Sequence, residues 1–373
     1  MRILAIEPYY GGSHRDFLDG WSSRSRHHWT LLTLPAHHWK WRMRHAATTL
    51  RTEAQQRGEH SEPWDLLWCS DMLSLADFKG LSHPAIARLP VIAYFHENQL
   101  TYPVRVPDER DLHFAITNFT TALAADQVWF NSAFHRDDFL AAVEALFAQM
   151  PDRPPRSELN EIRRKTRIFS PAVEDFRPRG SRRQGPPRIV WAARWEHDKD
   201  PDTLFAALRR LIDRGIDFRI SVLGQSFRQI PPAFNSARRW LKGHLEHWGF
   251  LTADEYRNAL LDADLFVSTA QHEFFGIAAV EAMLAGAYPL LPNRLAYPEL
   301  LAGLRTAERE SFLYDGTSIQ LAERLEILIQ RLPRGCLWTA APDQLRRLVA
   351  RYRWQPAATA MDRAAELLTA THQ

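Results

Sequence analysis

The sequence lacks several features that would restrict its function at once. It holds two cysteines among 373 residues and no apolar run of the roughly 18 residues that a membrane helix needs. Its first strand-like stretch, residues 2–8, begins without an apolar signal segment. We therefore expect no membrane partner and the cytoplasm as the simplest location. Cys69 and Cys336 stand among apolar neighbours and are interpreted as small buried residues.

Motifs for common cofactors and metals are also missing. The chain has neither a GxGxxG fingerprint nor a GxxxxGK[ST] loop, so a nicotinamide cofactor or a P-loop nucleotide site gets little support. Its 16 histidines include the pairs His27–His28 and His37–His38, which do not have metal-ligand spacing. The stretch "LLDADLF" resembles a DxD motif, but Asp264 is expected to open a strand. We predict no cofactor and no metal.

Charge is nearly balanced overall but uneven along the chain. The formal net charge is +3, yet residues 151–188 hold eleven Lys and Arg against five Asp and Glu. A second basic stretch, residues 39–51, reads "WKWRMRHAATTLR". Either stretch alone is more typical of a solvated face than of a nucleic-acid site.

The order of expected elements indicates two similar halves. In the first half, strand-like stretches occur at residues 2–8, 29–34, 65–70, 90–98, 127–132 and 166–173, with helical spacing in residues 14–24 and 132–150. In the second half, further strands are expected within residues 187–195, 217–224, 240–251, 256–269 and 287–293. A helix over residues 201–215 has Pro at its start and Gly at its end.

These strands are continuously apolar, which is typical of parallel sheets covered on both faces. The join, residues 170–187, is rich in Pro, Gly and charge. The fold class we predict is α/β, with two Rossmann-like, doubly wound domains facing a central cleft. The domains are expected at residues 1–170 and 171–355, with a last helix at 356–373 that can pack on the first. Ligands then bind at the carboxyl ends of the strands.

Two loops of the first half carry candidate ligand groups. Gly11 and Gly12 follow the first strand and let the backbone approach a ligand, although such a pair is more often a plain turn. The fourth strand ends in four polar side chains, which would be costly to bury without partners: His96, Glu97, Asn98 and Gln99. A satisfied polar turn is the alternative. After the fifth strand, Asn131 is a candidate contact and Ser132 a helix cap.

The second half offers cations. Arg194 and Lys199 lie on one loop and are suited to clamp a diphosphate, Arg by forked contacts and Lys as a point charge. The alternative is ordinary pairing with the acidic residues Glu196, Asp198 and Asp200.

The stretch "QHEFFGIAAVEAM", residues 271–283, places two carboxylates around a helix start. Amides of Phe275, Gly276 and Ile277 would face an anion. Glu273 is suited to sugar hydroxyls and Glu281 to a ribose diol, so a nucleotide-sugar fits. The alternatives are a cap-like role for Glu273 and a solvated helix position for Glu281.

These residues carry a resemblance. "HEFFGIAAVE" resembles the E-x7-E motif of retaining glycosyltransferases with the GT-B fold, and Arg194 and Lys199 have the spacing of their paired cations. A more detailed similarity is to the tRNA-queuosine mannosyltransferase family. It rests on stretches over most of the chain: "YYGGSHRDF", "LPAHHWKWRMRHAA", "DMLSLADFKGL", "YFHENQLTYPV", "NSAFHRDDFL" and "HEFFGIAAVEAM".

The resemblance implies transfer of mannose from GDP-mannose to the cyclopentenediol of queuosine in a tRNA anticodon, without a metal. It implies that Glu281 holds ribose, that Glu273 holds the transferred sugar, and that His96 sits beside the reacting carbon. Arg194 and Lys199 would hold the diphosphate, with Gly11, Gly12 and the helix amides also on the donor. Acceptor contacts are expected from His14, Lys40, Arg42, Arg44, Glu97, Asn98, Gln99 and Asn131.

Two other functions remain open at this stage. One keeps a nucleotide-sugar donor and changes the acceptor to a glycan, a lipid headgroup or a small metabolite. The other is a tRNA-binding module with a relict nucleotide cleft, which the intact cations and carboxylates disfavour.

For residues 39–51, indole faces beside cations suit unstacked bases and phosphates. An amphipathic helix with Trp39 and Trp41 in the core and its cations in water is the alternative.

Overall fold

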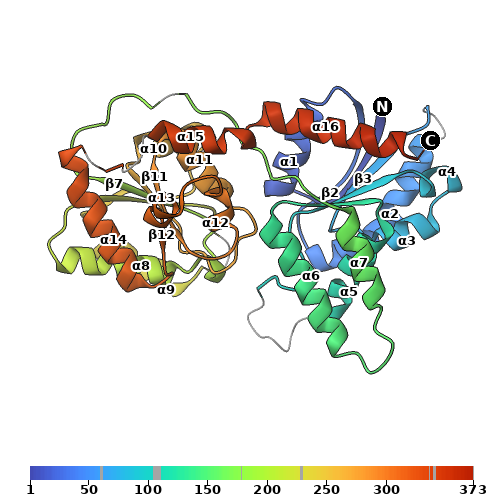
Figure 1. Ribbon diagram of the computed structural model, residues 1–373, viewed down its shortest axis with the longest axis horizontal. Helices are drawn as coiled ribbons and strands as arrows, with labels where there is room; N and C mark the ends of the chain where they lie inside the picture. The colour runs from blue at the N-terminus through green and yellow to red at the C-terminus, as the bar shows by residue number, and fades with distance from the viewer. Residues whose placement is uncertain are drawn as a thin grey trace. The chain divides into compact units, whose positions relative to one another are not determined.

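The chain folds into two compact units in the computed structural model, which describes residues 1–58, 62–103, 111–177, 179–226, 230–335, 337–338 and 342–372. Unit 1 combines Met1–Ala172 with the C-terminal Trp354–Gln373, and unit 2 is Val173–Arg353. The linker composition predicts a boundary after residue 170, and the structure divides the chain after Ala172. Each unit has its own sheet (Figure 1).

Unit 1 is built on six parallel strands in the order β2-β1-β3-β4-β5-β6. Their bounds are β1 Arg2–Tyr10, β2 His28–Pro35, β3 Leu66–Ser70, β4 Val91–Phe95, β5 Gln127–Phe130 and β6 Thr166–Ile168. The central strands β3 and β4 are buried along their whole length, as the continuous apolar runs predict. The strand order reverses between β1 and β3, and this switch point is where such sheets bind ligands.

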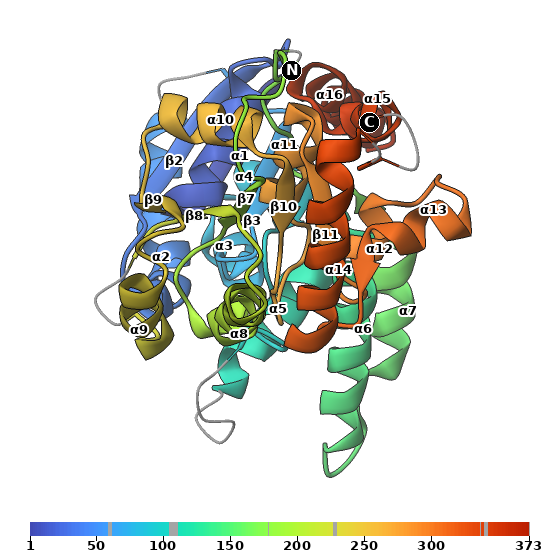
Figure 2. The same cartoon turned by 90° about the vertical axis from the view of Figure 1, so that its left-hand side faces the viewer.

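Helices cover both faces of this sheet. They are α1 Gly12–Ser22, α2 Trp39–Gly58, α3 Leu75–Leu81, α4 Pro84–Ala87, α5 Leu112–Ala124, α6 Ala133–Ala148 and α7 Arg156–Lys165. The α6 and α7 helices lie side by side in both ribbon views (Figures 1 and 2). Ser132 caps α6 by accepting a hydrogen bond from the His135 amide, which confirms the predicted cap.

The C-terminal helix α16, Trp354–Ala370, packs on α1 of unit 1 (Figure 1). The Trp354 ring occupies the space beside Gly20, where a Cβ would lie 2.0 Å from a ring carbon. Trp21 Nε1 donates to Asp362 at 2.8 Å, and the Arg26 amide donates to the same carboxylate at 2.9 Å. A buried carboxylate with several donors is a satisfied one, so these bonds fix α16 on the unit.

Unit 2 repeats the architecture with a different order, β12-β11-β10-β7-β8-β9, again with parallel pairing. The strands are β7 Arg188–Ala192, β8 Arg219–Leu223, β9 Leu245–Gly249, β10 Leu265–Val267, β11 Tyr288–Pro292 and β12 Leu313–Tyr314. In chain order within the unit this is the Rossmann order 3-2-1-4-5-6, with its switch point between β7 and β10.

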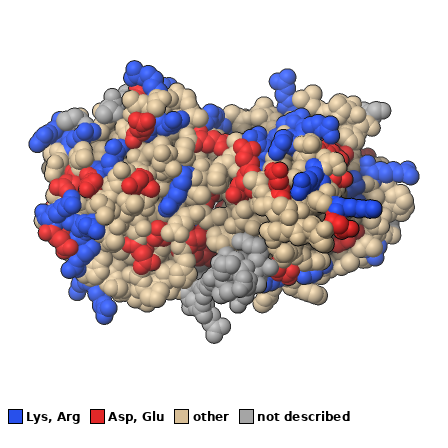
Figure 3. Space-filling view, turned by 60° about the horizontal axis from the view of Figure 1, so that its bottom comes forward, with Lys and Arg blue, Asp and Glu red and all other residues tan. Residues whose placement is uncertain are grey.

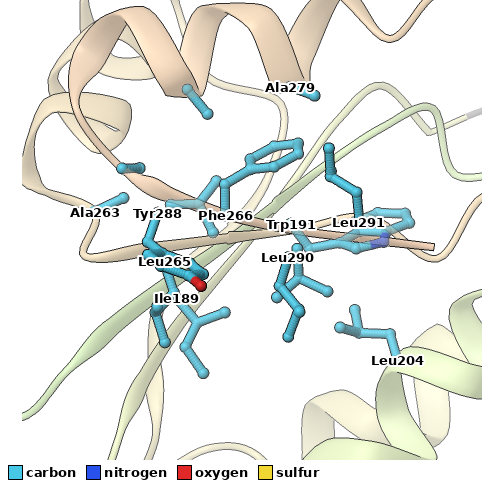
Figure 4. Close-up of a cluster of buried hydrophobic side chains, with 14 of the residues drawn as sticks. Ile189, Trp191, Leu204, Ala263, Leu265, Phe266, Ala279, Tyr288, Leu290 and Leu291 are labelled. Carbon is cyan, nitrogen blue, oxygen red and sulfur yellow. The ribbon is translucent and has the colours of Figure 1, made fainter. Parts of the chain in front are cut away.

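The helices of unit 2 are α8 Pro201–Asp213, α9 Pro232–Trp240, α10 Ala253–Asp262, α11 Ile277–Ala285, α12 Tyr297–Leu300, α13 Thr306–Ser311, α14 Ser318–Arg331 and α15 Pro342–Val349. The α8 and α14 helices pack together in both views (Figures 1 and 2). In Figure 4, the side chain of Phe266 of β10 and Ala279 of α11 lie on one side of the sheet, and Leu204 of α8 lies on the other. A core on each face explains the continuously apolar strands.

The predicted fold class is confirmed: both units are α/β with doubly wound parallel sheets, and every strand expected above is present. Cys69 is buried as predicted, whereas Cys336 lies outside the described residues. No helix among the described residues is long and apolar enough to cross a membrane.

Candidate active site

The carboxyl edge of the unit 1 sheet contains a buried carboxylate, Glu7 of β1, which is 0% exposed. Its Oε1 accepts hydrogen bonds from the Tyr9 amide at 2.8 Å and from Ser70 Oγ at 2.9 Å. Its Oε2 lies 3.2 Å from Nδ1 of His14, the third residue of α1. An ionised carboxylate is tolerated in an interior only when it is paired and hydrogen-bonded, and Glu7 is both.

The ring of His14 is stacked on the ring of His96, with centroids 3.9 Å apart and planes inclined by 26°. Burial lowers the pKa of His14, but the charge and hydrogen bond of Glu7 outweigh it and raise the pKa to about 9. Burial and the charge of His14 lower the pKa of His96 well below its usual range. At neutral pH, therefore, a charged imidazole lies against a neutral one.

Polar side chains bind the backbone of His96. The Asp71 Oδ1 accepts from the His96 amide at 2.9 Å, and Asn131 Nδ2 donates to the His96 carbonyl at 2.9 Å. Burial raises the pKa of Asp71 to about 8, partly offset by the charge of His14. Asp71 Oδ2 and His96 Nε2 are buried and have no hydrogen-bond partner among the described residues. Unsatisfied polar atoms are rare in native interiors and mark this edge as a functional candidate.

The remaining polar residues after β4 mostly organise the loop. Asn98 Oδ1 accepts from the amides of Leu100 and Thr101, both at 3.0 Å. The Gln99 amide donates to Asn118 at 2.7 Å, while Gln99 Nε2 donates to Glu97 at 3.1 Å. The alternative of a satisfied polar turn therefore accounts for the Asn98 side-chain oxygen, but among the described residues its Nδ2 stays buried without a partner.

Glu7, His14 and His96 also form a compact group of possible metal ligands, with one atom from each lying within 4.8 Å of the others. Both oxygens of Glu7 already accept hydrogen bonds, however, and the two imidazoles are stacked rather than converging. We therefore interpret the group as an ion pair against a neutral ring.

The glycine pair before α1 has two separate structural causes. Gly11 is extended, and a Cβ there would lie 2.5 Å from the Ala36 Cβ. Gly12 has φ +51°, a backbone conformation that favours glycine. Close packing and conformation therefore account for both residues independently of the donor contact that we expect from them.

The basic stretch on α2 differs from both expectations. Arg42 is buried, donating from Nε to the Pro35 carbonyl at 3.0 Å and contacting His37 and His45. The assignment of Arg42 to RNA phosphate is therefore corrected: its guanidinium holds the loop before α2. Trp41, which the amphipathic alternative buries, is 61% exposed instead.

The neighbours of Arg42 on α2 remain available at the surface. Lys40 is exposed and lies over the Trp39 ring at 5.7 Å. Arg44 lies over the Phe114 ring at 4.8 Å and pairs with Asp111 at 3.3 Å. The Trp41 ring stacks on His45, with centroids 4.9 Å apart, and the residue is 61% exposed.

Part of the second basic stretch, residues 151–188, is paired with carboxylates of unit 2. Arg179 and Arg182 both bind Asp264, which is 1% exposed, and Arg188 binds Glu246 at 3.2 Å. On the face in Figure 3, Lys and Arg atoms are interspersed with Asp and Glu atoms. Pairing of this kind makes the stretch a weaker candidate for RNA than its composition indicates.

Lys199 is the central cation of the unit 2 edge. Its side chain is 8% exposed, and Nζ donates to the His272 carbonyl at 2.6 Å. Nζ also lies 3.1 Å from Asp198 and 3.5 Å from Glu273. Lys199 therefore makes the ion pair with Asp198 that was the alternative expectation. It also contacts Glu273, the carboxylate predicted to bind the sugar.

Arg194 differs from Lys199 in its exposure. Its side chain is 46% exposed and lies 3.2 Å from Glu196. Two cations, one fixed and one accessible, thus follow the same strand β7 at the switch point of the sheet.

The loop before α11 places Glu273 beside free helix amides. Glu273 is half-buried, and its Oε1 accepts weakly from the Phe275 amide at 3.5 Å. Gly276 caps α11 with φ +97°, and a Cβ there would press on the Tyr297 ring at 3.0 Å. The amides of Ile277 and Ala278, the first two of the helix, have no intrahelical acceptor by their position and suit an anion, whereas the Ala279 amide donates to the Gly276 carbonyl at 3.0 Å.

A cavity of about 20 Å³ lies beneath this loop, lined in part by Lys199, Glu273, Gly276, Ser268 and Tyr297. That volume holds about one water molecule. A diphosphate is too large to fit within that space.

Glu281 is held by a residue that the sequence did not single out. The Tyr256 hydroxyl of α10 donates to Glu281 Oε2 at 2.7 Å, and burial together with Glu281 raises the pKa of that hydroxyl well above its usual range. Glu281 is thus a half-buried, positioned carboxylate, and the alternative of a solvated helix position is wrong.

Sequence reasoning missed several other residues of the two edges: Glu7, Ser70, Asp71, Asn118 and Tyr256. A usable signal existed for Glu7, because a charge within an apolar buried strand is rare unless it is paired. Asp71 directly follows the apolar run of β3 and carries the same signal.

The comparisons first define a class. Residues 173–330 match the family described as glycosyl transferases group 1. Sucrose-phosphate synthase from Thermosynechococcus elongatus superposes with a TM-score of 0.72 at 13% identity, over 100% of both chains. Anabaena HepE in complex with UDP gives 0.68 at 15% identity, over 98% of this chain and 100% of that one. Such identities show the fold alone, and with the family match they make the chain a GT-B glycosyltransferase.

A narrower match concerns unit 1. Residues 2–173 match the family described as tRNA-queuosine alpha-mannosyltransferase N-terminal. The tRNA-queuosine alpha-mannosyltransferase of Drosophila melanogaster is 36% identical over 310 residues, covering 80% of this chain and 81% of that protein. The chain belongs to the tRNA-queuosine alpha-mannosyltransferase family. A 2-deoxystreptamine glucosyltransferase of Streptomyces kanamyceticus is 30% identical over a shorter part, 39% of this chain and 36% of that protein.

Proposed function

We propose that this protein transfers mannose from GDP-mannose to queuosine in a tRNA anticodon, with retention at the anomeric carbon. The observation that carries the proposal is the family match of unit 1, because acceptor-side motifs distinguish this family from other glycosyltransferases. The cations and carboxylates of unit 2 support it, since they fit a nucleotide-sugar. Since the proposed acceptor is a tRNA, the compartment that we propose is the cytoplasm.

In unit 2, Arg194, Lys199 and the first amides of α11 hold the diphosphate. Glu273 accepts hydrogen bonds from the sugar and Glu281 from the ribose diol. During transfer the anomeric carbon–oxygen bond breaks with its electron pair moving to the diphosphate. Fixed positive groups around that oxygen stabilise the charge as it develops, and one such contact is worth on the order of a hundredfold in rate.

In unit 1, His96 contacts the transferred sugar or the attacking hydroxyl, and Asn98 and Asn131 contact the acceptor; Asn131 also donates to the His96 carbonyl. The acceptor oxygen forms the new bond on the face that the leaving group vacates, and its proton passes to the departing diphosphate. A neutral imidazole suits this position because it can accept or donate a hydrogen bond to a hydroxyl.

We propose that no metal takes part, because Arg194 and Lys199 supply the positive field at the diphosphate. Dialysis against EDTA is therefore expected to leave the initial rate unchanged. Loss of turnover that is restored by magnesium or manganese would contradict this part of the mechanism.

The deciding experiment incubates the protein with radiolabelled GDP-mannose, UDP-glucose and GDP-glucose, each with total tRNA that contains or lacks queuosine. We expect label in RNA only with GDP-mannose and queuosine-containing tRNA. Label from another donor, or in a small hydroxylated acceptor, would favour the second candidate, which the shorter match to a glucosyltransferase keeps open. tRNA binding without transfer would favour the relict module.

A further inference from the structure

Glu7 and His14 form a buried pair with no assigned role beyond the acceptor contact expected of His14. We propose that this pair is a positioning device for His96, fixing its ring and keeping it uncharged for the transfer reaction. The inference rests on the proposed function, because it assigns a task to a residue of that site.

The geometry leaves His96 little freedom. His14 covers one face of its ring at 3.9 Å, while the rings of Phe17 and Tyr94 meet it edge to face at 5.4 and 4.6 Å. The backbone on either side is tied to Asp71 and Asn131. A ring so enclosed has one orientation, as a reacting group requires.

His14 is itself fixed by Glu7 and not by solvent. Its side chain is 8% exposed and the Glu7 side chain 0%, with 3.2 Å between Nδ1 and Oε2. Glu7 is anchored in turn by Ser70 and by the Tyr9 amide. The chain of contacts therefore runs from β3 through β1 and α1 to the end of β4.

Charge supports the same assignment. The titratable groups that face the stacked rings are Glu7 on β1, His14 on α1, Asp71 after β3, Glu97 after β4 and His135 on α6. Burial lowers the pKa of His96 most, and the positive charge of His14 lowers it further, so the ring stays neutral at neutral pH. Without Glu7, His14 would lose the partner that keeps it charged.

The test measures kcat and KM between pH 5 and 9 for the full-length wild type and three variants: His14→Phe, Glu7→Gln and the double variant. His14→Phe keeps a ring to stack and removes the charge. His96 then protonates more readily, so the acidic limb of the kcat profile should move up by about one pH unit. Glu7→Gln should move it the same way by less, with KM for GDP-mannose unchanged in each.

The double variant separates action through His14 from a direct effect. If Glu7 works by holding His14 charged, the double variant should match His14→Phe. If the pH shifts of the two single variants add up in the double variant, Glu7 does not act through His14 and the proposal is overturned. His27→Gln, at the opposite edge of the sheet beside Glu366, is the matched control and should leave the profile unchanged.

A second readout does not need turnover. Histidine-labelled protein reports the titration of His96 by NMR, and its pKa should rise in His14→Phe. An unchanged titration overturns the proposal, as does a tightly bound divalent ion whose removal abolishes the difference. If the wild type transfers no mannose to any tRNA, the proposed function fails while this titration still decides the pair's role. Should His14→Phe not fold, Glu7→Gln carries both measurements.

Discussion

The two strand edges hold their charges in opposite ways. In unit 1 the charges of Glu7 and His14 are buried and neutralise each other. In unit 2 Arg194 is 46% exposed, and Lys199 is tied between carboxylates and a carbonyl. A paired, desolvated charge adjusts its neighbours, whereas an accessible cation can still receive an anion. We therefore expect substitutions in unit 1 to change turnover without changing donor binding, and substitutions in unit 2 to change donor binding, with a loss of turnover as well where the cation is fixed.

The largest effect is expected from Lys199→Ala. It removes a fixed cation near the diphosphate and leaves Asp198 and Glu273 facing each other without it. We predict a fall in kcat of about a hundredfold or more and weaker GDP binding. Rates under saturating tRNA and calorimetry with GDP measure the two effects.

Arg194→Ala is the matched control for Lys199. Because the Arg194 side chain is exposed, Arg194→Ala should weaken donor binding without lowering the melting temperature. Lys199→Ala should lower both the donor affinity and the melting temperature, because Lys199 is buried and paired. Equal melting temperatures for the two variants would show that Lys199 contributes nothing to the loop before α11.

His96→Ala tests the other edge. We predict that turnover falls by roughly tenfold to a hundredfold, the range expected when a positioned hydrogen bond is removed, while GDP affinity stays as in the wild type. His96 Nε2 has no hydrogen-bond partner among the described residues, so no side-chain hydrogen bond is lost, but the ring contacts with His14 and Tyr94 are, and a moderate fall in melting temperature is expected. A large drop in melting temperature with normal activity of the folded fraction would make it a structural histidine.

Glu281→Ala should weaken GDP binding about tenfold or more, as expected for a charge-assisted hydrogen bond worth roughly 1.5–3 kcal/mol. Tyr256→Phe should produce a smaller loss, because it frees the same carboxylate without removing it. Calorimetry on both variants checks the order. Unchanged affinity in Glu281→Ala would remove ribose from its role.

The fold was predictable because its signals are local and strong. Apolar strand runs, the Pro and Gly at the ends of residues 201–215, and the cap at Ser132 each specify one conformation. The candidate site was predictable where a motif lies in one stretch, as between Glu273 and Glu281. It was not predictable where partners come from different elements: Ser70 meets Glu7 because of the strand order, and Tyr256 meets Glu281 because α10 packs on α11.

Arg42 shows the same limit for a single residue. Composition predicts a surface cation, yet Pro35, His37 and His45 surround its guanidinium. Spacing along α2 does not reveal that the loop before the helix folds back over this position.

The smallest expected effect concerns α2, on which Lys40 and Arg44 are exposed and Arg42 is buried. Lys40, Trp41 and Arg44 are exposed on the same helix, so they suit the phosphates and bases of a single-stranded anticodon loop. We predict that Lys40→Ala with Arg44→Ala weakens tRNA binding a few-fold and leaves GDP-mannose affinity alone. The slope of log affinity against log salt should flatten by about 0.7 for each phosphate that the variant no longer neutralises.

Arg42→Ala is the control for that double variant, and it should change the stability of the protein rather than the salt dependence of tRNA binding. It leaves the Pro35 carbonyl without its donor, so we expect a loss of stability of about 1–3 kcal/mol and a salt slope equal to that of the wild type. Denaturant unfolding measures the change in stability. Filter binding at salt concentrations between about 50 and 200 mM measures the salt slope. If Arg42→Ala flattened the slope while Lys40→Ala with Arg44→Ala did not, the buried guanidinium would be the one that meets RNA, and α2 would have to rearrange to present it.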